Sequence, residues 1–204
     1  MTISFSSPAG ADGSNRHHAA AAIGNVDVTT QAIGALQSVL DGDESYERLL
    51  LKAAAGAGKS YALRRLVREA IAHPDCTRVG VTAFANKQVY PLAMELGKAL
   101  GRDKVCIAVA KDRYDDLPEA MHDACTVAVS YKEVPDDAQV VLGTTHKLQG
   151  SYHWLLKSIG PATNGEKLFD VLFVDEAWQL PLHRYRRIDG FAPVVVGVGD
   201  VGQL

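Results

Sequence analysis

Two short stretches of the sequence carry residue types that bind and cleave nucleoside triphosphates. The first is AAAGAGKS, which has the spacing of a relaxed phosphate-binding loop and begins at Ala53, where glycine is commonest. Gly56 and Gly58 allow backbone turns that bring N–H groups close to phosphate oxygens. Lys59 supplies a cation for the β and γ phosphates, and Ser60 supplies a hydroxyl for Mg²⁺. The residues expected to hold the nucleotide are Ala54, Ala55, Gly56, Ala57, Gly58, Lys59 and Ser60.

The second stretch is FDVLFVDEAWQL, an apolar run that ends in Asp175 and Glu176. A carboxylate at the end of a buried strand can hold Mg²⁺ through its water shell, which is the role expected of Asp175. The adjacent Glu176 can orient and deprotonate a water for attack on the γ-phosphate. An Asp-Glu pair alone is more often an exposed strand end. In a chain that also has a phosphate-binding loop, it favours a hydrolytic site.

The elements that must position these residues follow from the pattern of apolar runs. Short apolar runs alternate with helical patterns, which is typical of βαβ units and a mostly parallel sheet. Strands are expected at 49–53, 79–83, 105–110, 140–144, 171–174 and 194–198, with another short strand within 124–129, and helices at 61–72, 87–100 and 146–159. The fold class is therefore α/β, a three-layer sandwich. In such sheets ligands bind at the carboxyl ends of the strands, where both motifs are expected to meet.

The amino-terminal segment has a different composition from the rest of the chain. Residues 1–24 are rich in Ser, Gly, Ala and His without periodicity, so we expect a disordered arm followed by one domain over 25–204. A helix capped by Thr29 or Thr30 is expected to end at the Asp41-Gly42 turn.

Composition narrows the class of protein. The chain has 204 residues, 47% of them hydrophobic, and a net charge of −3, so any nucleic-acid binding requires a local patch. Three cysteines at wide spacings match neither a disulfide framework nor a zinc site. No apolar run is long enough to span a bilayer, and a secretory signal is lacking at the start. We therefore expect a cytoplasmic protein with no membrane partner.

Six motifs in order carry a resemblance to a known family. They are TTQAIGALQ, AAAGAGKS, VTAFANK, GTTHKLQG, LFVDEAWQL and VVVGVGDVGQL. In this order they resemble the motifs of the first RecA-like domain of superfamily-one helicases, over about residues 28–204. Two of the six, the Walker-type motifs AAAGAGKS and LFVDEAWQL, are specific individually, and the other four are weak.

The resemblance implies roles for further residues. Gln31 would read the adenine edge, and Gln203 would sense the γ-phosphate as a third catalytic residue beside Lys59 and Glu176. The residues in the positions that contact a single strand in the family are Thr82, Asn86, Lys87, Thr145 and His146. Each has a plainer interpretation as a capping or solvent-exposed residue. The family also implies that the strand ending at Gly199 lies between the phosphate-loop strand and the Asp175 strand.

The function implied by the resemblance is hydrolysis of ATP with Mg²⁺, coupled to single-stranded nucleic acid, with DNA expected. The family's working unit is two such domains, and an arginine from the second completes the site. Because the chain matches only the first domain, we expect a second RecA-like domain in cis or in trans. Without it, we expect ATP–Mg²⁺ binding with feeble hydrolysis and no unwinding. The alternative is a stand-alone nucleotide-dependent binding module, or a degenerate P-loop ATPase without helicase activity.

Other candidates have plainer explanations. A GTPase would need Asn-Lys-x-Asp, and NKQV at 86–89 lacks the Asp. A small-molecule kinase would not need the Asp-Glu pair and usually has an arginine-rich lid; the nearest match is HRYRR at 183–187, which is better explained as a solvated face. Trp154 and Trp178 have the chemistry to stack on bases, but packing is the favoured interpretation.

Overall fold

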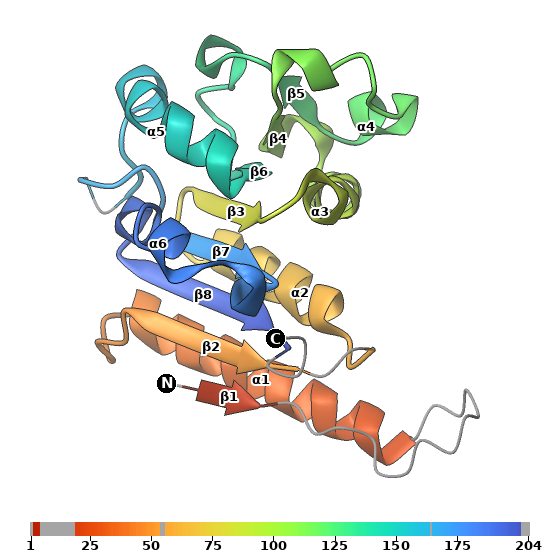
Figure 1. The fold of residues 1–204 in the computed structure, drawn as a ribbon. Helices are drawn as coiled ribbons and strands as arrows, with labels where there is room; N and C mark the ends of the chain where they lie inside the picture. Colours follow the sequence, from red (N-terminus) through yellow and green to blue (C-terminus); the bar gives the residue numbers. More distant parts are fainter. Residues whose placement is uncertain (1, 5–18, 54–55, 164, 201–204) are drawn as a thin grey trace.

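The computed structural model describes residues 2–4, 19–53, 56–163 and 165–200. Its centre is an eight-stranded sheet in the order β1-β2-β8-β7-β3-β6-β4-β5, in which every neighbouring pair is parallel. The strands are β1 (Thr2–Ser4), β2 (Arg48–Lys52), β3 (Val79–Ala83), β4 (Val105–Ala108), β5 (Thr126–Ala128), β6 (Val140–Thr144), β7 (Val171–Asp175) and β8 (Val194–Gly199). Because all strands run the same way, their carboxyl ends form one edge, on the right in Figure 1. The α/β fold class predicted from the sequence is confirmed.

Helices cover both faces of the sheet (Figure 1). The α-helices are α1 (Ala19–Leu40), α2 (Lys59–Ala72), α3 (Asn86–Leu100), α4 (Glu119–Ala124), α5 (Thr145–Ile159) and α6 (Leu182–Tyr185). Short 3-10 turns are η1 (Arg102–Lys104), η2 (Lys111–Arg113), η3 (Tyr131–Glu133), η4 (Ala177–Gln179) and η5 (Asp189–Phe191). The first four helices share one buried cluster with the sheet, and α5 shares the other. These two clusters make a three-layer sandwich.

Alternation along the strands explains why the core has two halves. In β7, Phe173 belongs to the cluster under α1 to α4, whereas Leu172 and Val174 belong to the cluster under α5. Successive side chains of a strand point to opposite faces, so a strand covered on both faces must be apolar throughout. All five residues of β7 are buried, and so are all six of β8.

The strand order at the centre of the sheet agrees with the order that the helicase resemblance implied. Strand β8 pairs with β2 on one side, where Leu51 lies opposite Val198, and with β7 on the other, where Asp175 lies opposite Val198. The phosphate-loop strand and the Asp175 strand are therefore separated by the strand that ends at Gly199. This expectation is confirmed.

The amino-terminal part differs from the prediction. Helix α1 begins at Ala19, ten residues before the predicted caps, and the hydroxyls of Thr29 and Thr30 donate to the carbonyls of Asn25 and Val26 at 2.7 and 3.0 Å. Threonine makes this bond to the preceding turn inside a helix, so neither residue is a cap. Strand β1 and the first turns of α1 also fall within residues 1–24, so the expected disordered arm does not hold for these two parts.

A buried arginine ties the amino edge of the sheet to α5. The guanidinium of Arg78 donates to the carbonyls of Ile159, Gly160 and Asp136 at 3.1, 2.8 and 3.3 Å. Burial lowers its pKa, and the nearby carboxylate of Asp170 opposes this effect. Arg78 therefore satisfies the last carbonyls of α5, which a helix leaves without internal partners.

Two further features bear on later arguments. Helices α3 and α4 approach most closely at Gly97, where an added Cβ would collide with the backbone carbonyl of Ala124. Within the described ranges, none of the helices has both the length and the apolar character needed to cross a bilayer.

Candidate active site

Three strand ends meet where the two predicted motifs were expected. Lys52 lies opposite Gly199, and the next residue, Ala53, donates its N–H to the carbonyl of Gly199 at 2.9 Å. Asp175 pairs with Val198 on the other side of β8. The phosphate-binding loop and the Asp-Glu pair therefore leave the same edge of the sheet, with one strand between them.

The phosphate-binding loop turns directly into α2. Gly56 and Gly58 have φ of 76° and 84°, the left-handed region that glycine enters without a steric penalty. Helix α2 begins at Lys59, and its fourteen residues bury one face through Leu63, Leu66 and other apolar positions. Its first-turn N–H groups lack helical acceptors, which gives this helix end the character of an anion site. Ala54 and Ala55 lie outside the described residues.

A short ion pair joins the two motifs. The Nζ of Lys59 lies 3.4 Å from Oε1 of Glu176, and the two side chains are only 11% and 17% exposed. Oε2 of Glu176 is buried and has no hydrogen-bond partner among the described residues. Glu176 also has φ of 49°, the one positive φ outside glycine in the described part of the chain. An orphaned carboxylate oxygen on a strained backbone, beside a buried cation, is typical of a functional site.

Asp175 lies beneath this pair at the end of β7. Its residue is 8% exposed, and its Oδ1 accepts the N–H of Glu176 at 3.0 Å. Burial and, to a smaller extent, the charge of Glu176 raise the pKa of Asp175 from 3.8 to about 6, although that hydrogen bond and the charge of Lys59 oppose the shift. Because burial removes part of the solvent around this carboxylate, a bound cation would stabilise its charged form. Asp175 and the exposed hydroxyl of Ser60 are the residues that fit Mg²⁺.

The end of β8 is covered by the turn that follows β7. A Cβ at Gly199 would lie 2.6 Å from Cε3 of Trp178 and 3.1 Å from the backbone nitrogen of Ala177. Glycine is therefore required for η4 to pack against β8. Trp178 is half-buried in this contact, as the packing interpretation predicted. Gln203, the predicted γ-phosphate sensor, lies outside the described residues.

The loops after β3 and β6 leave the same edge, but two of their predicted nucleic-acid contacts are buried. Thr82 and Thr145 are 1% and 2% exposed, and their hydroxyls lie 3.3 Å apart. Thr145 also hydrogen-bonds the carbonyl of Ala83 at 3.2 Å. A direct role in contacting a single strand is therefore wrong for these two threonines in this structure. They join β3 to the start of α5, because a hydroxyl buried at a strand end needs a partner.

Other side chains from the same loops do reach the surface. Lys87 and His146 are exposed, and Asn86 is half-buried at the start of α3. Phe84 was not among the predicted site residues, yet it is 50% exposed on the loop between β3 and α3. In the sequence it looks like one more apolar residue after a strand. The one indication that Phe84 could be exposed is its position directly after Ala83, the last residue of β3 that pairs with β6.

A pair of amides connects these loops to the Asp-Glu motif. The side chain of Gln88 accepts the N–H of Ala85 at 3.0 Å and donates to Oε1 of Gln179 at 3.1 Å. Gln179 closes the 3-10 turn that follows Glu176. Neither glutamine carried a signal in the sequence, because an amide on a helix is ordinarily solvent-exposed. Gln31, the predicted adenine reader, is exposed on α1, which packs against α2, and its role stays a prediction.

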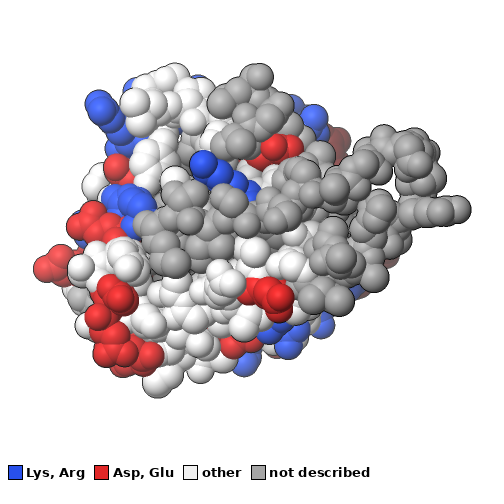
Figure 2. Space-filling view, turned by 90° about the horizontal axis from the view of Figure 1, so that it is seen from below, with Lys and Arg blue, Asp and Glu red and all other residues white. Residues whose placement is uncertain are grey.

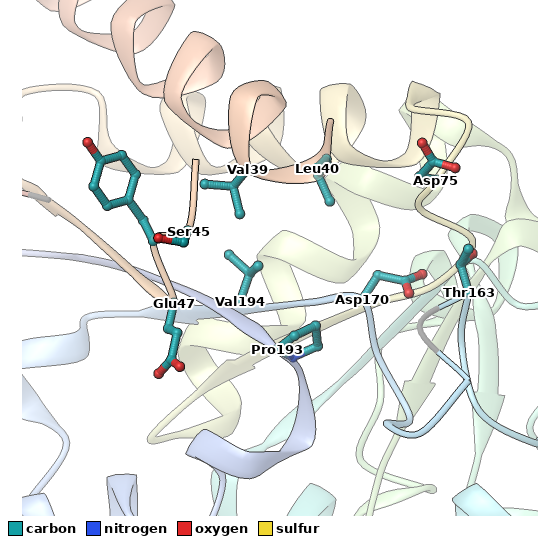
Figure 3. Close-up of a pocket in the computed structure, with 10 residues that line it drawn as sticks. Val39, Leu40, Ser45, Glu47, Asp75, Thr163, Asp170, Pro193 and Val194 are labelled. Atoms are coloured by element: carbon teal, nitrogen blue, oxygen red, sulfur yellow. The ribbon is translucent and has the colours of Figure 1, made fainter. Parts of the chain in front are cut away.

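A separate hollow lies at the opposite edge of the sheet. Its volume is about 400 Å³, and Val39, Leu40 and Val194 contribute apolar surface (Figure 3). The acidic residues Glu47, Asp75 and Asp170 also line it. Acidic side chains gather at this margin, on the left in Figure 2; the exposed acidic residues of the loop after α1 are Asp41, Asp43, Glu44 and Glu47. This negative surface disfavours phosphate, so the hollow is not the nucleotide site.

No model of a protein family matches the chain, and no curated protein matches it. The functional argument therefore depends on the geometry at the carboxyl edge.

Proposed function

We propose that this chain binds ATP with Mg²⁺ at the carboxyl edge of its sheet and is an ATPase domain of the superfamily-one helicase type. The observation that carries the proposal is the distance of 3.4 Å between Nζ of Lys59 and Oε1 of Glu176. Two sequence motifs that were interpreted as phosphate-binding and hydrolytic thus present their charged groups to one another. A phosphate chain bound there would displace this ion pair.

Each residue has a role in this proposal. Lys59 and the first-turn N–H groups of α2 hold the phosphates, and Ser60 and Asp175 hold the metal. Bound Mg²⁺ would neutralise charge that develops on the phosphate oxygens. Glu176, released from Lys59, holds a water through its carboxylate and accepts the proton as the water attacks.

Single-stranded nucleic acid is the second ligand in the proposal. Phe84, on the loop after β3, and Lys87 and His146, in the first turns of α3 and α5, are exposed at the same edge of the sheet as the proposed nucleotide site. An aromatic face and cations suit a flexible strand, because bases stack and phosphates attract positive charge. The hydrogen bond between Gln88 and Gln179 links this surface to the turn that carries Glu176. Such a link supports coupling of hydrolysis to strand binding, as in a helicase or translocase with a second RecA-like domain.

A nucleotide-dependent binding module is the second candidate, and the same ion pair favours it. Phosphate that takes Lys59 away from Glu176 would free a buried carboxylate and move charge within the turn after β7. A switch needs this kind of local rearrangement, with or without turnover.

Calorimetric titration with ATP and Mg²⁺ tests the shared first step. Lys59→Ala should weaken binding at least ten-fold, because it removes the cation that meets the β and γ phosphates. Lys104→Ala is the matched control, since Lys104 is exposed in η1 at the opposite edge. Absence of ATP binding in the unaltered chain, or unchanged affinity in Lys59→Ala, would refute the proposal. ATP turnover measured with and without single-stranded DNA then separates the two candidates.

A further inference from the structure

An exposed aromatic pair lies on the outer surface of α5, away from the loops discussed above. Packing was the favoured interpretation of Trp154, but this residue is 54% exposed. Its ring stacks on Tyr131, with centroids 5.6 Å apart and planes within 18°. Tyr131 covers one face of the indole and holds it in place. The exposed surface of Trp154 therefore lies largely on the face of the indole that is opposite Tyr131.

Helix α5 leads from the candidate nucleic-acid loops to this pair. His146, Gly150 and Trp154 are all exposed and are spaced by four residues, so they share one side of the helix. At a rise of about 1.5 Å per residue, Trp154 lies roughly 12 Å along the axis from His146. Gly150 has open space where a Cβ would stand, so no side chain separates His146 from Trp154 on this side.

The charge of this surface favours an anionic ligand. The fifteen residues of α5 include lysines and histidines but no Asp or Glu. Lys157, one turn beyond Trp154, is exposed, and so is Lys132, next to Tyr131. Glu133, the next residue after Lys132, is also exposed, and its carboxylate accepts the N–H of Val129 at 2.9 Å.

We propose that Trp154, supported by Tyr131, is a stacking platform for a base of single-stranded nucleic acid that continues along α5 from the edge of β3 and β6. The proposal rests on the proposed function, because it extends the same strand-binding surface. A fixed indole with one free face suits any base, since every base has a π face. Lysines on both sides of the ring suit the phosphates that flank a stacked base. The combination favours nucleic acid over a protein partner, whose interface would be expected to need a larger apolar area around the ring.

Fluorescence anisotropy with labelled oligothymidylate and oligouridylate at low salt tests the platform in the full chain. Trp154→Ala should weaken binding by roughly five- to a hundred-fold, the range found for loss of one stacked base, and Trp154→Phe should retain most of the affinity. Tyr46→Ala is the matched control, because Tyr46 is an exposed aromatic that lines the hollow at the opposite edge. In Trp178→Phe, Trp154 is the sole tryptophan, and its emission should be quenched by either oligonucleotide.

The outcomes separate this inference from the proposed function. Unchanged affinity in Trp154→Ala, with weaker binding in Phe84→Ala, would overturn the platform and leave the proposed strand-binding loops intact. A change of sedimentation behaviour in Trp154→Ala without loss of oligonucleotide affinity would mean a protein interface and would also overturn it. Absence of ATP binding by the unaltered chain in the calorimetric titration would refute the proposed function, independently of the oligonucleotide measurements.

Discussion

Substitution of Glu176 by Gln should strengthen ATP binding while it abolishes hydrolysis. The carboxylate of Glu176 holds the Nζ of Lys59 at 3.4 Å, and ATP must displace it to reach that cation. At an effective dielectric constant of about 20, this attraction is about 5 kcal/mol, which is an upper bound because both groups also lose solvation. We take about 1–2 kcal/mol as the net strength of the ion pair after this loss of solvation. Because ATP no longer has to break the ion pair in Glu176→Gln, its affinity should rise roughly five- to thirty-fold.

Calorimetric titration of the protein with ATP and Mg²⁺ measures the change in affinity. Steady-state turnover measures the loss of the general base, which should lower the rate of ATP hydrolysis about 10²–10⁴-fold. Glu95→Gln is the matched control, because Glu95 forms a surface ion pair with Arg64 at 2.6 Å. The control should alter neither quantity. Equal or weaker ATP affinity in Glu176→Gln would refute the argument that the ion pair restrains Lys59.

Three further substitutions test the fold and its electrostatics, each by urea denaturation. Asp175→Asn should raise the free energy of unfolding by about 3 kcal/mol at neutral pH, because the folded state raises the carboxyl pKa from 3.8 to about 6. The gain should fade as pH falls through this range and vanish below about pH 3, where the carboxyl is neutral in both the folded and the unfolded state; a pH-independent difference would contradict it. Arg78→Met should cost about 3–5 kcal/mol because it leaves buried carbonyls unpaired, whereas Arg68→Met, at an exposed position of α2, should cost almost nothing. Gly97→Ala should cost at least about 1–3 kcal/mol through its collision with the end of α4, whereas Gly34→Ala, with open space in α1, should gain about 0.5–1 kcal/mol; equal effects would refute the packing argument.

Much of the sheet was predictable because its strands are buried on both faces. Such strands appear in the sequence as continuous apolar runs, and β3 and β6 have the predicted bounds, 79–83 and 140–144. The position of β8 between β2 and β7 came from the helicase resemblance, since apolar runs alone contain no information on strand order.

The orientation of individual side chains was less predictable. Thr82 and Thr145 follow apolar residues at the expected edge, but each lies where the other can satisfy its hydroxyl. Trp154 was expected to be a packing residue, yet the buried apolar positions of α5 are taken by Leu148, Leu155 and Ile159. The ion pair between Lys59 and Glu176 could not be predicted from the sequence either, because it depends on the distance between the ends of β2 and β7.

The pairing of β2 with β8 also has a consequence for the order of folding. Arg48 pairs with Val195, so the strand that leads into the phosphate-binding loop has neighbours only in β1 and in the last strand of the sheet. Contacts between residues so distant in sequence form slowly, since a long loop must close first. On the ribosome, β3, β6 and β4 can pair well before β8 is synthesised, whereas until then β2 can pair only with β1 and stays separate from β7. The nucleotide site should therefore be among the last parts of the molecule to assemble, and a nascent chain should acquire ATP binding only after β8 has emerged.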